Sequence, residues 1–249
     1  MVKTIAIVLA GGLGKRMNSD LPKPAHKIGE KSMLQHVVDK LNRLNIEKMF
    51  IVFGQKGDML KASVVHQDNM VWVHQDPQLG TGHAVQVAFT EIKKHYSDAD
   101  LQVLVCNGDA PFIKDETLSK LQTNNQHHSA TLLTCFVKNQ HGYGRIEREN
   151  EKFLRIVEEK DCTDEQRKIN CINAGSYCFT FDALNNFIFT LTDNNAQKEF
   201  YLTDMFEILV NNKKSVGIVE IDDEVEIFNI NNRSQLDEAN ELFIKLKMA

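Results

Sequence analysis

The sequence predicts an α/β fold in which a mixed, mostly parallel central sheet carries helices on both faces. In the first half of the chain, short β-branched apolar runs alternate with segments of helical periodicity. Such alternation is typical of right-handed crossovers between parallel strands. After about residue 126 the apolar runs become shorter and more polar, which indicates further strands, some of them antiparallel.

The first strand is expected at residues 4–9, a β-branched run that ends in glycines. A helix should follow over 32–44, where Met33, Val37 and Leu41 recur on one face. The cycle is expected to repeat, with strands at 48–52, 70–73 and 101–106 and helices at 59–65, 83–94 and 115–122.

The second half predicts a different series of elements. Strands are expected at 130–136, 145–147, 154–157, 177–181 and 215–221, with a turn at 142–144, and helices at 182–191 and 204–210. Ser234 and Asp237 form a capping-box-like pair that should open a last helix. Because the chain shows no internal repeat and no Pro- or Ser-rich linker, we expect a single domain over 1–249 that is built from two lobes.

Composition excludes several classes of protein. The 249 residues are 42% hydrophobic and 25% charged, enough for a sizeable core, and the net charge of −5 without a long basic run argues against a nucleic-acid partner. Five dispersed cysteines without a Cys-x-x-Cys pair favour a reducing cytoplasm over a disulfide framework or a zinc site. The apolar runs are shorter than the roughly 18 residues that span a bilayer, so no membrane association is expected.

A glycine-rich segment, Leu9-Ala-Gly-Gly-Leu-Gly-Lys-Arg-Met17, follows the first predicted strand. Its bare N–H groups would lie at the carboxyl edge of the sheet, where phosphate oxygens can approach closely and Lys15 and Arg16 add positive charge. The segment has neither the P-loop nor the dinucleotide-binding spacing. The pattern alone therefore predicts either a phosphate-binding loop or a tight turn that needs positive φ.

Two further residues carry charge near the same predicted edge. Lys23 stands between Pro22 and Pro24, which stiffen the backbone around its ammonium group. Asp109 comes directly after the strand at 101–106, where a single carboxylate can supply the protein's share of a magnesium site. Taken singly, a solvated loop lysine and an acid in an Asn-Gly-Asp turn are the alternatives.

Several stretches together carry a resemblance that runs the length of the chain. The most specific are Gln78-Leu-Gly-Thr-Gly-His-Ala84 and Thr163-Asp-Glu-Gln-Arg167. The others lie at 9–17, 21–23, 32–36, 108–109, 142–146, 157–158, 160–161, 172–173, 194–197, 201–204 and 231–233. On these stretches the chain resembles the uridylyltransferase domain of bacterial GlmU. The resemblance implies a Rossmann-like sugar nucleotidyltransferase fold with a smaller sugar-binding lobe. It assigns residues 1–126 as the nucleotide-binding half and residues 127–249 as the sugar-binding half.

The resemblance also implies an activity. The expected reaction transfers UMP from UTP to N-acetylglucosamine 1-phosphate, with Mg²⁺ as cofactor, and yields UDP-N-acetylglucosamine and pyrophosphate. A pyrophosphorylase for another sugar 1-phosphate or nucleotide, for instance thymidylyl or guanylyl transfer, is the alternative within the class. A non-catalytic nucleotide-sugar sensor is the alternative outside it.

Site residues follow from the resemblance position by position. The uridine would be held by Leu9, Ala10, Gly11, Gly12, Gln75, Gly80 and Thr81. The sugar would contact Gly144, Glu158 and Asn173, with Tyr201 and Thr203 close by. Asp109 and Asn231 would bind the metal, and the cationic Arg16 and Lys23 would offset the phosphate charge.

The chain departs from the family pattern in three ways. Lys15 and Ala174 each stand where threonine is usual, and the loss of a hydroxyl at Ala174 could loosen a sugar contact. The sequence also lacks the hexapeptide repeats with which bacterial GlmU acetylates its sugar and forms trimers. We therefore expect an already acetylated substrate and no role for acetyl-CoA, and the sequence leaves a monomer or a dimer open.

Overall fold

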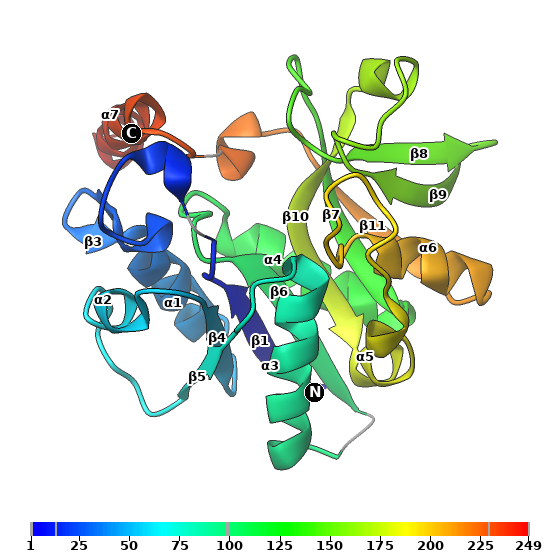
Figure 1. Cartoon of the computed structure of the whole chain (residues 1–249), viewed down its shortest axis with the longest axis horizontal. Coiled ribbons are helices and arrows are strands. Elements are labelled where there is room, and N and C mark those ends of the chain that lie inside the picture. Colours follow the sequence, from blue (N-terminus) through cyan, green and yellow to red (C-terminus); the bar gives the residue numbers. More distant parts are fainter. Residues whose placement is uncertain (1, 13, 98–99, 229, 249) are drawn as a thin grey trace.

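The computed structural model describes residues 2–12, 14–97, 100–228 and 230–248. Within these residues a 9-stranded mixed sheet runs through the molecule in the order β11-β7-β10-β6-β1-β4-β5, with β8 paired to β10 and β9 to β8 (Figure 1). The strands are β1 (Lys3–Leu9), β4 (Met49–Phe53), β5 (Met70–His74), β6 (Leu101–Asn107), β7 (Ala130–Phe136), β8 (Arg145–Glu149), β9 (Lys152–Val157), β10 (Cys171–Thr180) and β11 (Val216–Ile221). The mixed sheet confirms the predicted fold class.

The first four long strands are parallel: β1 pairs with both β4 and β6, and β4 with β5. Ile5, Ala6, Ile7 and Val8 of β1 are fully buried, as expected for a strand covered on both faces. The antiparallel β10 separates β6 from β7, which pairs in parallel with β11. The change to shorter and more polar apolar runs after about residue 126 thus corresponds to the point where antiparallel pairing begins.

Helices cover both faces of the sheet. Side chains of α3 (Thr81–His95), α5 (Phe181–Phe187) and α6 (Asp204–Asn211) pack with Ile5 and Ile7 in one core. Side chains of α1 (Met33–Arg43), α2 (Gly57–Lys61) and α4 (Asp115–Asn124) pack with Ala6 and Val8 in the other. The alternating side chains of one buried strand therefore supply both cores.

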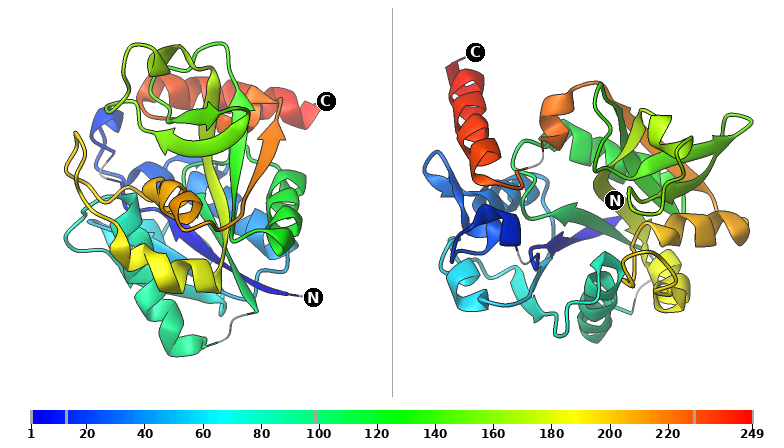
Figure 2. Two further views of the ribbon diagram at one scale, coloured as in Figure 1. Left: turned by 90° about the vertical axis from the view of Figure 1, so that its right-hand side faces the viewer. Right: turned by 45° about the horizontal axis from the view of Figure 1, so that its top comes forward.

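The last helix, α7 (Arg233–Met248), lies against a small hairpin formed by β2 (Lys27–Ile28) and β3 (Lys31–Ser32). The N–H of Gly29 in the hairpin turn donates to the Asn240 side chain at 2.9 Å. In the left view of Figure 2, α7 and the β8–β9 hairpin lie at the top of the molecule, and the N-terminus, where β1 begins, lies lower. The short 3₁₀ helices are η1 (Lys15–Met17), η2 (Lys23–Ala25), η3 (Asn125–His127), η4 (Gln166–Lys168), η5 (Ile188–Thr190) and η6 (Glu224–Ile227).

Two of the predicted boundaries differ from the structure by several residues. The helix expected at 59–65 ends at Lys61, and Val65 is 70% exposed, so it contributes no buried face. The strand expected at 177–181 begins at Cys171 and ends at Thr180, whose hydroxyl caps α5 by accepting from the N–H of Ala183 at 3.1 Å.

The predicted capping role of Ser234 is also wrong. The helix begins at Arg233, and the side-chain oxygen of Asn232 accepts from the N–H of Gln235 at 2.9 Å. Ser234 lies inside the first turn. Among the described residues, no helix combines the length and apolarity needed to cross a membrane.

Candidate active site

The glycine-rich loop leaves the end of β1 and is fixed on both sides by neighbouring strands. The N–H of Ala10 donates to Val52 O at 2.8 Å, and the N–H of Gly108 donates to Leu9 O at 2.9 Å. Gly14 has φ +54°, and a Cβ there would lie 3.0 Å from Cβ of Lys23. The loop therefore contains the positive-φ turn that the sequence predicted, and that turn packs directly against the proline-flanked lysine.

Four charged or polar residues predicted for the site converge beside this loop. The ammonium nitrogen of Lys23 lies 2.6 Å from Oδ2 of Asp109 and donates to Oδ1 of Asn231 at 2.9 Å. The guanidinium of Arg16 donates to the same Asn231 oxygen at 3.3 Å. Segments separated by up to 215 positions thus meet at one point. The side chain of Lys15, which was expected to add positive charge to this loop, lies outside the described part of the structure.

The oxygens of Asp109 and Asn231 form a donor set suited to a hard divalent cation. Both already accept from one cationic group, so both can face one small ion. A carboxylate and a carbonyl-type oxygen are ligands that such cations prefer, with water and phosphate oxygens completing the shell. Among the described residues, no three His, Cys, Asp or Glu side chains form a group that could hold a metal ion. The chemistry of the pair therefore fits an ion shared with a ligand.

The residues predicted for uridine line one cavity of about 400 Å³ next to the glycine loop, with Ala10 as the exception. Its lining residues are Leu9, Gly11, Gly12, Val52, Gln75, Gln78, Gly80, Thr81, Ala84, Asn107, Asp109 and Glu199. Ala10 is only 3% exposed and contributes its backbone to the β4 contact described above. Asp109 lines the same cavity, so the predicted metal ligand and the predicted nucleotide site are contiguous.

Two glutamines shape this cavity, and sequence reasoning selected only one of them. Gln75 is buried and donates to Gly80 O at 3.0 Å, which orients its amide. Gln78 donates to Gly11 O, and a Cβ on Gly54 would collide with its amide group. Gln78 therefore holds the glycine loop in place through the carbonyl oxygen of Gly11. The signal that could have found it is its place in the same Gln-x-x-Gln segment as Gln75.

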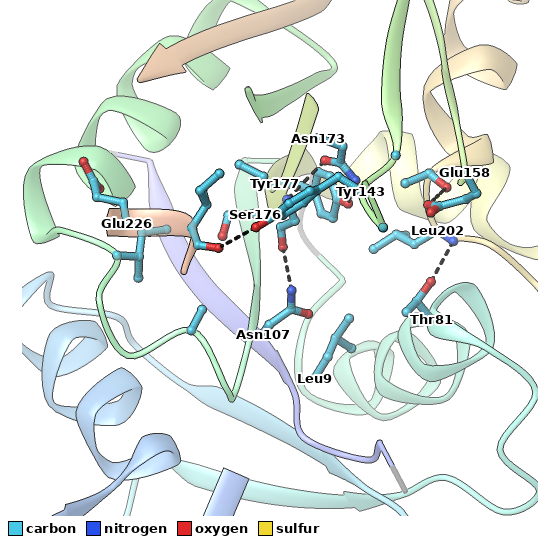
Figure 3. A pocket seen from close by; sticks show the side chains of 18 of the residues that line it. Leu9, Thr81, Asn107, Tyr143, Glu158, Asn173, Ser176, Tyr177, Leu202 and Glu226 are labelled. Atoms are coloured by element: carbon cyan, nitrogen blue, oxygen red, sulfur yellow. Dashed lines mark hydrogen bonds between the residues drawn. The ribbon is translucent and has the colours of Figure 1, made fainter. Parts of the chain in front are cut away.

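A second cavity, of about 190 Å³, adjoins the first and shares Leu9, Thr81 and Asn107 with it. It contains Gly144, Glu158, Asn173 and Thr203, four of the five residues predicted for the sugar. Figure 3 shows Asn173, Tyr177 and Tyr143 grouped together, with Glu158 beside Leu202 and Thr81. Ala174, where a threonine was expected, also lines this cavity. Strands β6, β9 and β10 therefore bring separated segments of the chain to one hollow.

Glu158 follows the end of β9 and accepts from the hydroxyl of Thr203 at 2.9 Å. Burial raises the pKa of its carboxyl, and the negative charges of Asp161 and Glu199 raise it further, while the bond from Thr203 acts in the opposite direction. Thr203 therefore lines the cavity and also fixes the orientation of the acid. The carboxylate is well suited to accept from a hydroxyl-rich ligand, because each hydrogen bond to it stabilises the charged form.

Asn173 lies beside a bulge in β10, and both ends of its amide are held by the protein. Its Nδ2 donates to the hydroxyl of Tyr177 at 2.7 Å, and its Oδ1 accepts from the N–H of Gly175 at 3.2 Å. Burial raises the pKa of Tyr177, which is only 5% exposed. Sequence reasoning missed Tyr177 because an aromatic residue in a strand normally belongs to the core.

Tyr201 is the predicted sugar residue that the structure places elsewhere. Its hydroxyl donates to Oδ2 of Asp161 at 3.2 Å, and its side chain lines a neighbouring cavity with Asp161 and Asp204. Glu158 borders both hollows. Tyr201 therefore lines a different cavity from the one that contains the other four residues predicted for the sugar.

The fold and the site define an α/β domain in which two adjoining cavities lie beside a glycine loop and a cluster of Lys23, Asp109 and Asn231. The chain belongs to the family of MobA-like NTP transferase domains, whose model matches residues 6–158. The chain is similar to the bifunctional protein GlmU of Clostridium beijerinckii, with 42% identity over 241 residues covering 95% of this chain and 51% of that protein. The corresponding protein of Clostridium perfringens is 41% identical over 233 residues, covering 93% and 50%. The chain thus spans about half the length of these curated relatives.

Solved structures with low sequence identity share the fold. A structure of UDP-glucose pyrophosphorylase complexed with UDP-glucose aligns with a TM-score of 0.79 at 18% identity, covering 98% of this chain and 99% of that one. A putative glucose-1-phosphate thymidylyltransferase from Bacillus anthracis aligns with a TM-score of 0.71 at 20% identity, covering 96% and 94%.

Proposed function

We propose that the protein is an N-acetylglucosamine-1-phosphate uridylyltransferase, which transfers UMP from UTP to N-acetylglucosamine 1-phosphate and releases pyrophosphate. The observation that carries the proposal is the meeting of Lys23, Asp109 and Asn231 beside the glycine loop. Asp109 of this cluster lines one of two adjoining cavities, which share Leu9, Thr81 and Asn107 and could each hold one of two substrates. The likeness to bifunctional GlmU proteins along the chain supports the choice of substrates.

The two halves of the chain divide the substrates between them. Residues 1–126 supply the nucleotide side, with the backbone of 9–12 and the side chains of Gln75 and Thr81 around the uridine. Residues 127–249 supply the sugar side, with Gly144, Glu158 and Asn173. The amide donors and acceptors of Gln75 suit the edge of uracil, and the glycines let the base lie against the backbone.

The reaction is an in-line substitution at the α-phosphorus of UTP. A phosphate oxygen of the sugar 1-phosphate forms the new P–O bond, and the bond to the bridging oxygen of the pyrophosphate breaks. A phosphate monoester is already ionised at neutral pH, so the step needs no protein base. The main obstacle is repulsion between two anions, which makes positioning and charge stabilisation the tasks of the protein.

Each residue of the cluster has a part in that task. Lys23 and Arg16 offset the negative charge that develops on the transferred and leaving groups. Asp109 and Asn231 would hold a Mg²⁺ ion, which would supply positive charge to offset that of the phosphates. The N–H groups of the glycine loop contribute further positive potential at the end of β1.

The sugar is recognised by polar groups whose orientations the protein has already fixed. Glu158 accepts from sugar hydroxyls while Thr203 holds its other side, and Asn173 uses the donor and acceptor capacity left free by Tyr177 and Gly175. Such preorganisation reduces the entropy lost when the sugar binds.

The five cysteines, all free and buried, are consistent with our placement of the enzyme in a reducing cytoplasm.

A direct assay tests the proposal. Pyrophosphate release is measured with UTP and N-acetylglucosamine 1-phosphate in the presence of Mg²⁺ and, as control, in EDTA. A panel with TTP, GTP and other hexose 1-phosphates separates this activity from related pyrophosphorylases. Release that is fastest with another pair would assign a different substrate, and tight UDP-sugar binding without turnover would indicate a sensor.

A further inference from the structure

The ammonium group of Lys23 is seated between the two oxygens that we assign to the divalent cation. It lies 2.6 Å from Asp109 Oδ2 and 2.9 Å from Asn231 Oδ1, and its side chain is only 13% exposed. The backbone on which it stands is held by two flanking prolines and by the packing of Gly14 against its Cβ. The lysine therefore reaches this position from a rigid support.

This position excludes a second cation from the same oxygens. A Mg²⁺ ion requires its oxygen ligands at about 2.0–2.1 Å, so an ion bound to both Asp109 Oδ2 and Asn231 Oδ1 would compete with the ammonium group for the space between these two atoms. Two positive centres within a few ångströms also repel each other. The ammonium of Lys23 must therefore leave Asp109 and Asn231 before a divalent cation can bind there.

The surroundings of the lysine restrict where its ammonium can go. On one side Arg16 already contacts Asn231 at 3.3 Å and presents another positive charge. On the other side Asp109 opens into the cavity next to the glycine loop. The phosphates of a bound nucleotide would lie there, and they are the anions that could replace the ion pair which Lys23 gives up.

We propose that Lys23 makes divalent-cation binding conditional on the nucleotide: it occupies the metal oxygens when the cavity holds no phosphate and moves to the phosphates when the nucleotide binds. The inference rests on the proposed nucleotide and metal sites, and it assigns the lysine a function before the chemical step. By linkage, a nucleotide that draws the ammonium away strengthens cation binding, and the cation strengthens nucleotide binding by the same factor. The protein thereby avoids holding a metal ion without its substrate.

The first test measures Mn²⁺ binding to the protein without nucleotide, from the electron paramagnetic resonance signal of free Mn²⁺. Lys23→Met removes the competing ammonium and should bind Mn²⁺ at least about 10-fold more tightly than the wild type, within the 5- to 150-fold range typical of coupled sites. Lys27→Met is the matched control, because exposed Lys27 lies on the nearby β2 and its loss changes the net charge equally. The control should bind Mn²⁺ as the wild type does.

Three results of this titration would overturn the proposal. The first is a Lys23→Met protein that binds Mn²⁺ no more tightly than the wild type. The second is an equal gain in Lys27→Met, which would indicate a general charge effect. The third is a gain that survives the addition of Asp109→Ala to Lys23→Met, because the new site would then lie elsewhere. Thermal unfolding shows that each variant is folded, and Lys23→Gln replaces the methionine variant if that one is not.

A second test follows the ammonium group itself. Its ¹H–¹⁵N signal, identified by its loss in Lys23→Met, should shift when UTP is added in EDTA and stay in place when uridine is added. An unchanged signal in protein saturated with UTP would overturn the inference. Neither test depends on turnover: pyrophosphate release without the Mn²⁺ gain would leave the proposed function intact, and the Mn²⁺ gain without pyrophosphate release would refute the proposed function alone.

Discussion

The amide nitrogen of Asn173 donates to the hydroxyl of Tyr177 at 2.7 Å, across a bulge in the strand that carries both residues. Since Oδ1 of Asn173 accepts from Gly175, the amide has one defined orientation toward the cavity. The hydroxyl group of Tyr177 thus helps to fix the orientation of the Asn173 amide.

Tyr177→Phe removes only this hydroxyl and keeps the buried ring. We expect the KM for the sugar phosphate to rise about 3- to 10-fold, because a hydrogen bond of this kind contributes about 0.5–1.5 kcal/mol, while kcat and the KM for UTP change less. Steady-state kinetics with each substrate varied in turn checks this. Tyr96→Phe is the control, because Tyr96 follows the end of α3 and its hydroxyl donates to Glu47. A Tyr177→Phe enzyme with unchanged KM for the sugar would remove Tyr177 from sugar recognition.

Asp109→Ala should reduce pyrophosphate release by about 10²- to 10³-fold or more, because it removes one of two oxygen ligands and a preorganised charge. The side chain is 23% exposed and follows the end of β6, so the fold should survive. The assay is pyrophosphate release in Mg²⁺, with far-ultraviolet circular dichroism to verify folding. Asp20→Ala is a suitable control, because Asp20 is a fully exposed acid that lies close to Lys23 in the sequence. Near-normal turnover in Asp109→Ala would contradict the metal assignment.

Lys23→Ala should slow the chemical step more than it weakens sugar binding. The ammonium group contacts Asp109 and Asn231, while the groups predicted for the sugar surround a different cavity. We expect kcat to fall by about 10²-fold or more and the KM for the sugar phosphate to remain within a few-fold. Equal rates for variant and wild type at saturating substrates would exclude a catalytic role for Lys23.

Asp204 makes stability depend on pH in an unusual direction for a carboxyl group. Burial raises its pKa to about 6, and the neighbouring acids Glu207, Glu158 and Asp161 add to the shift. With a native pKa above the unfolded value, the native state binds more protons between about pH 4 and pH 6, so stability falls as pH rises through this window. Above pH 6 the charged side chain imposes its full cost.

Asp204→Asn should therefore raise the melting temperature at pH 7.5 by about 2–4 °C, which corresponds to on the order of 1 kcal/mol for a chain of this size. The gain should vanish below about pH 4, where both proteins carry a neutral group at this position. Differential scanning calorimetry across this range provides the measurement. Asp182→Asn, in the first turn of α5 and exposed, is the matched control and should show no such pH-dependent gain. A gain for Asp204→Asn that persists at pH 3.5 would refute the electrostatic explanation.

Sequence periodicity was sufficient for the long elements because their burial is regular. The β-branched run of β1 is buried on both faces, and α1 and α3 each keep an apolar face toward a core. The β2–β3 hairpin has two residues in each strand, which is too short for any period, and it was missed. Serine and asparagine both cap helices, so local sequence could not choose between Ser234 and Asn232 as the cap of α7. In the structure the helix begins at Arg233, and the side chain of Asn232 accepts from the N–H of Gln235.

The sequence by itself determined the fold class, and it located a glycine-rich loop after the first strand and the charged residues Lys23 and Asp109 near the same edge of the sheet. These follow from local chemistry, since a glycine turn, a proline-flanked cation and an acid at a strand end are recognisable wherever they occur. Only the tertiary structure decided that Asn231 meets Lys23, that Tyr177 orients Asn173 and that Tyr201 lines a different cavity from Asn173. Those contacts join positions from different strands and helices, and their distances are set by how the sheet and its helices pack, which no local pattern encodes.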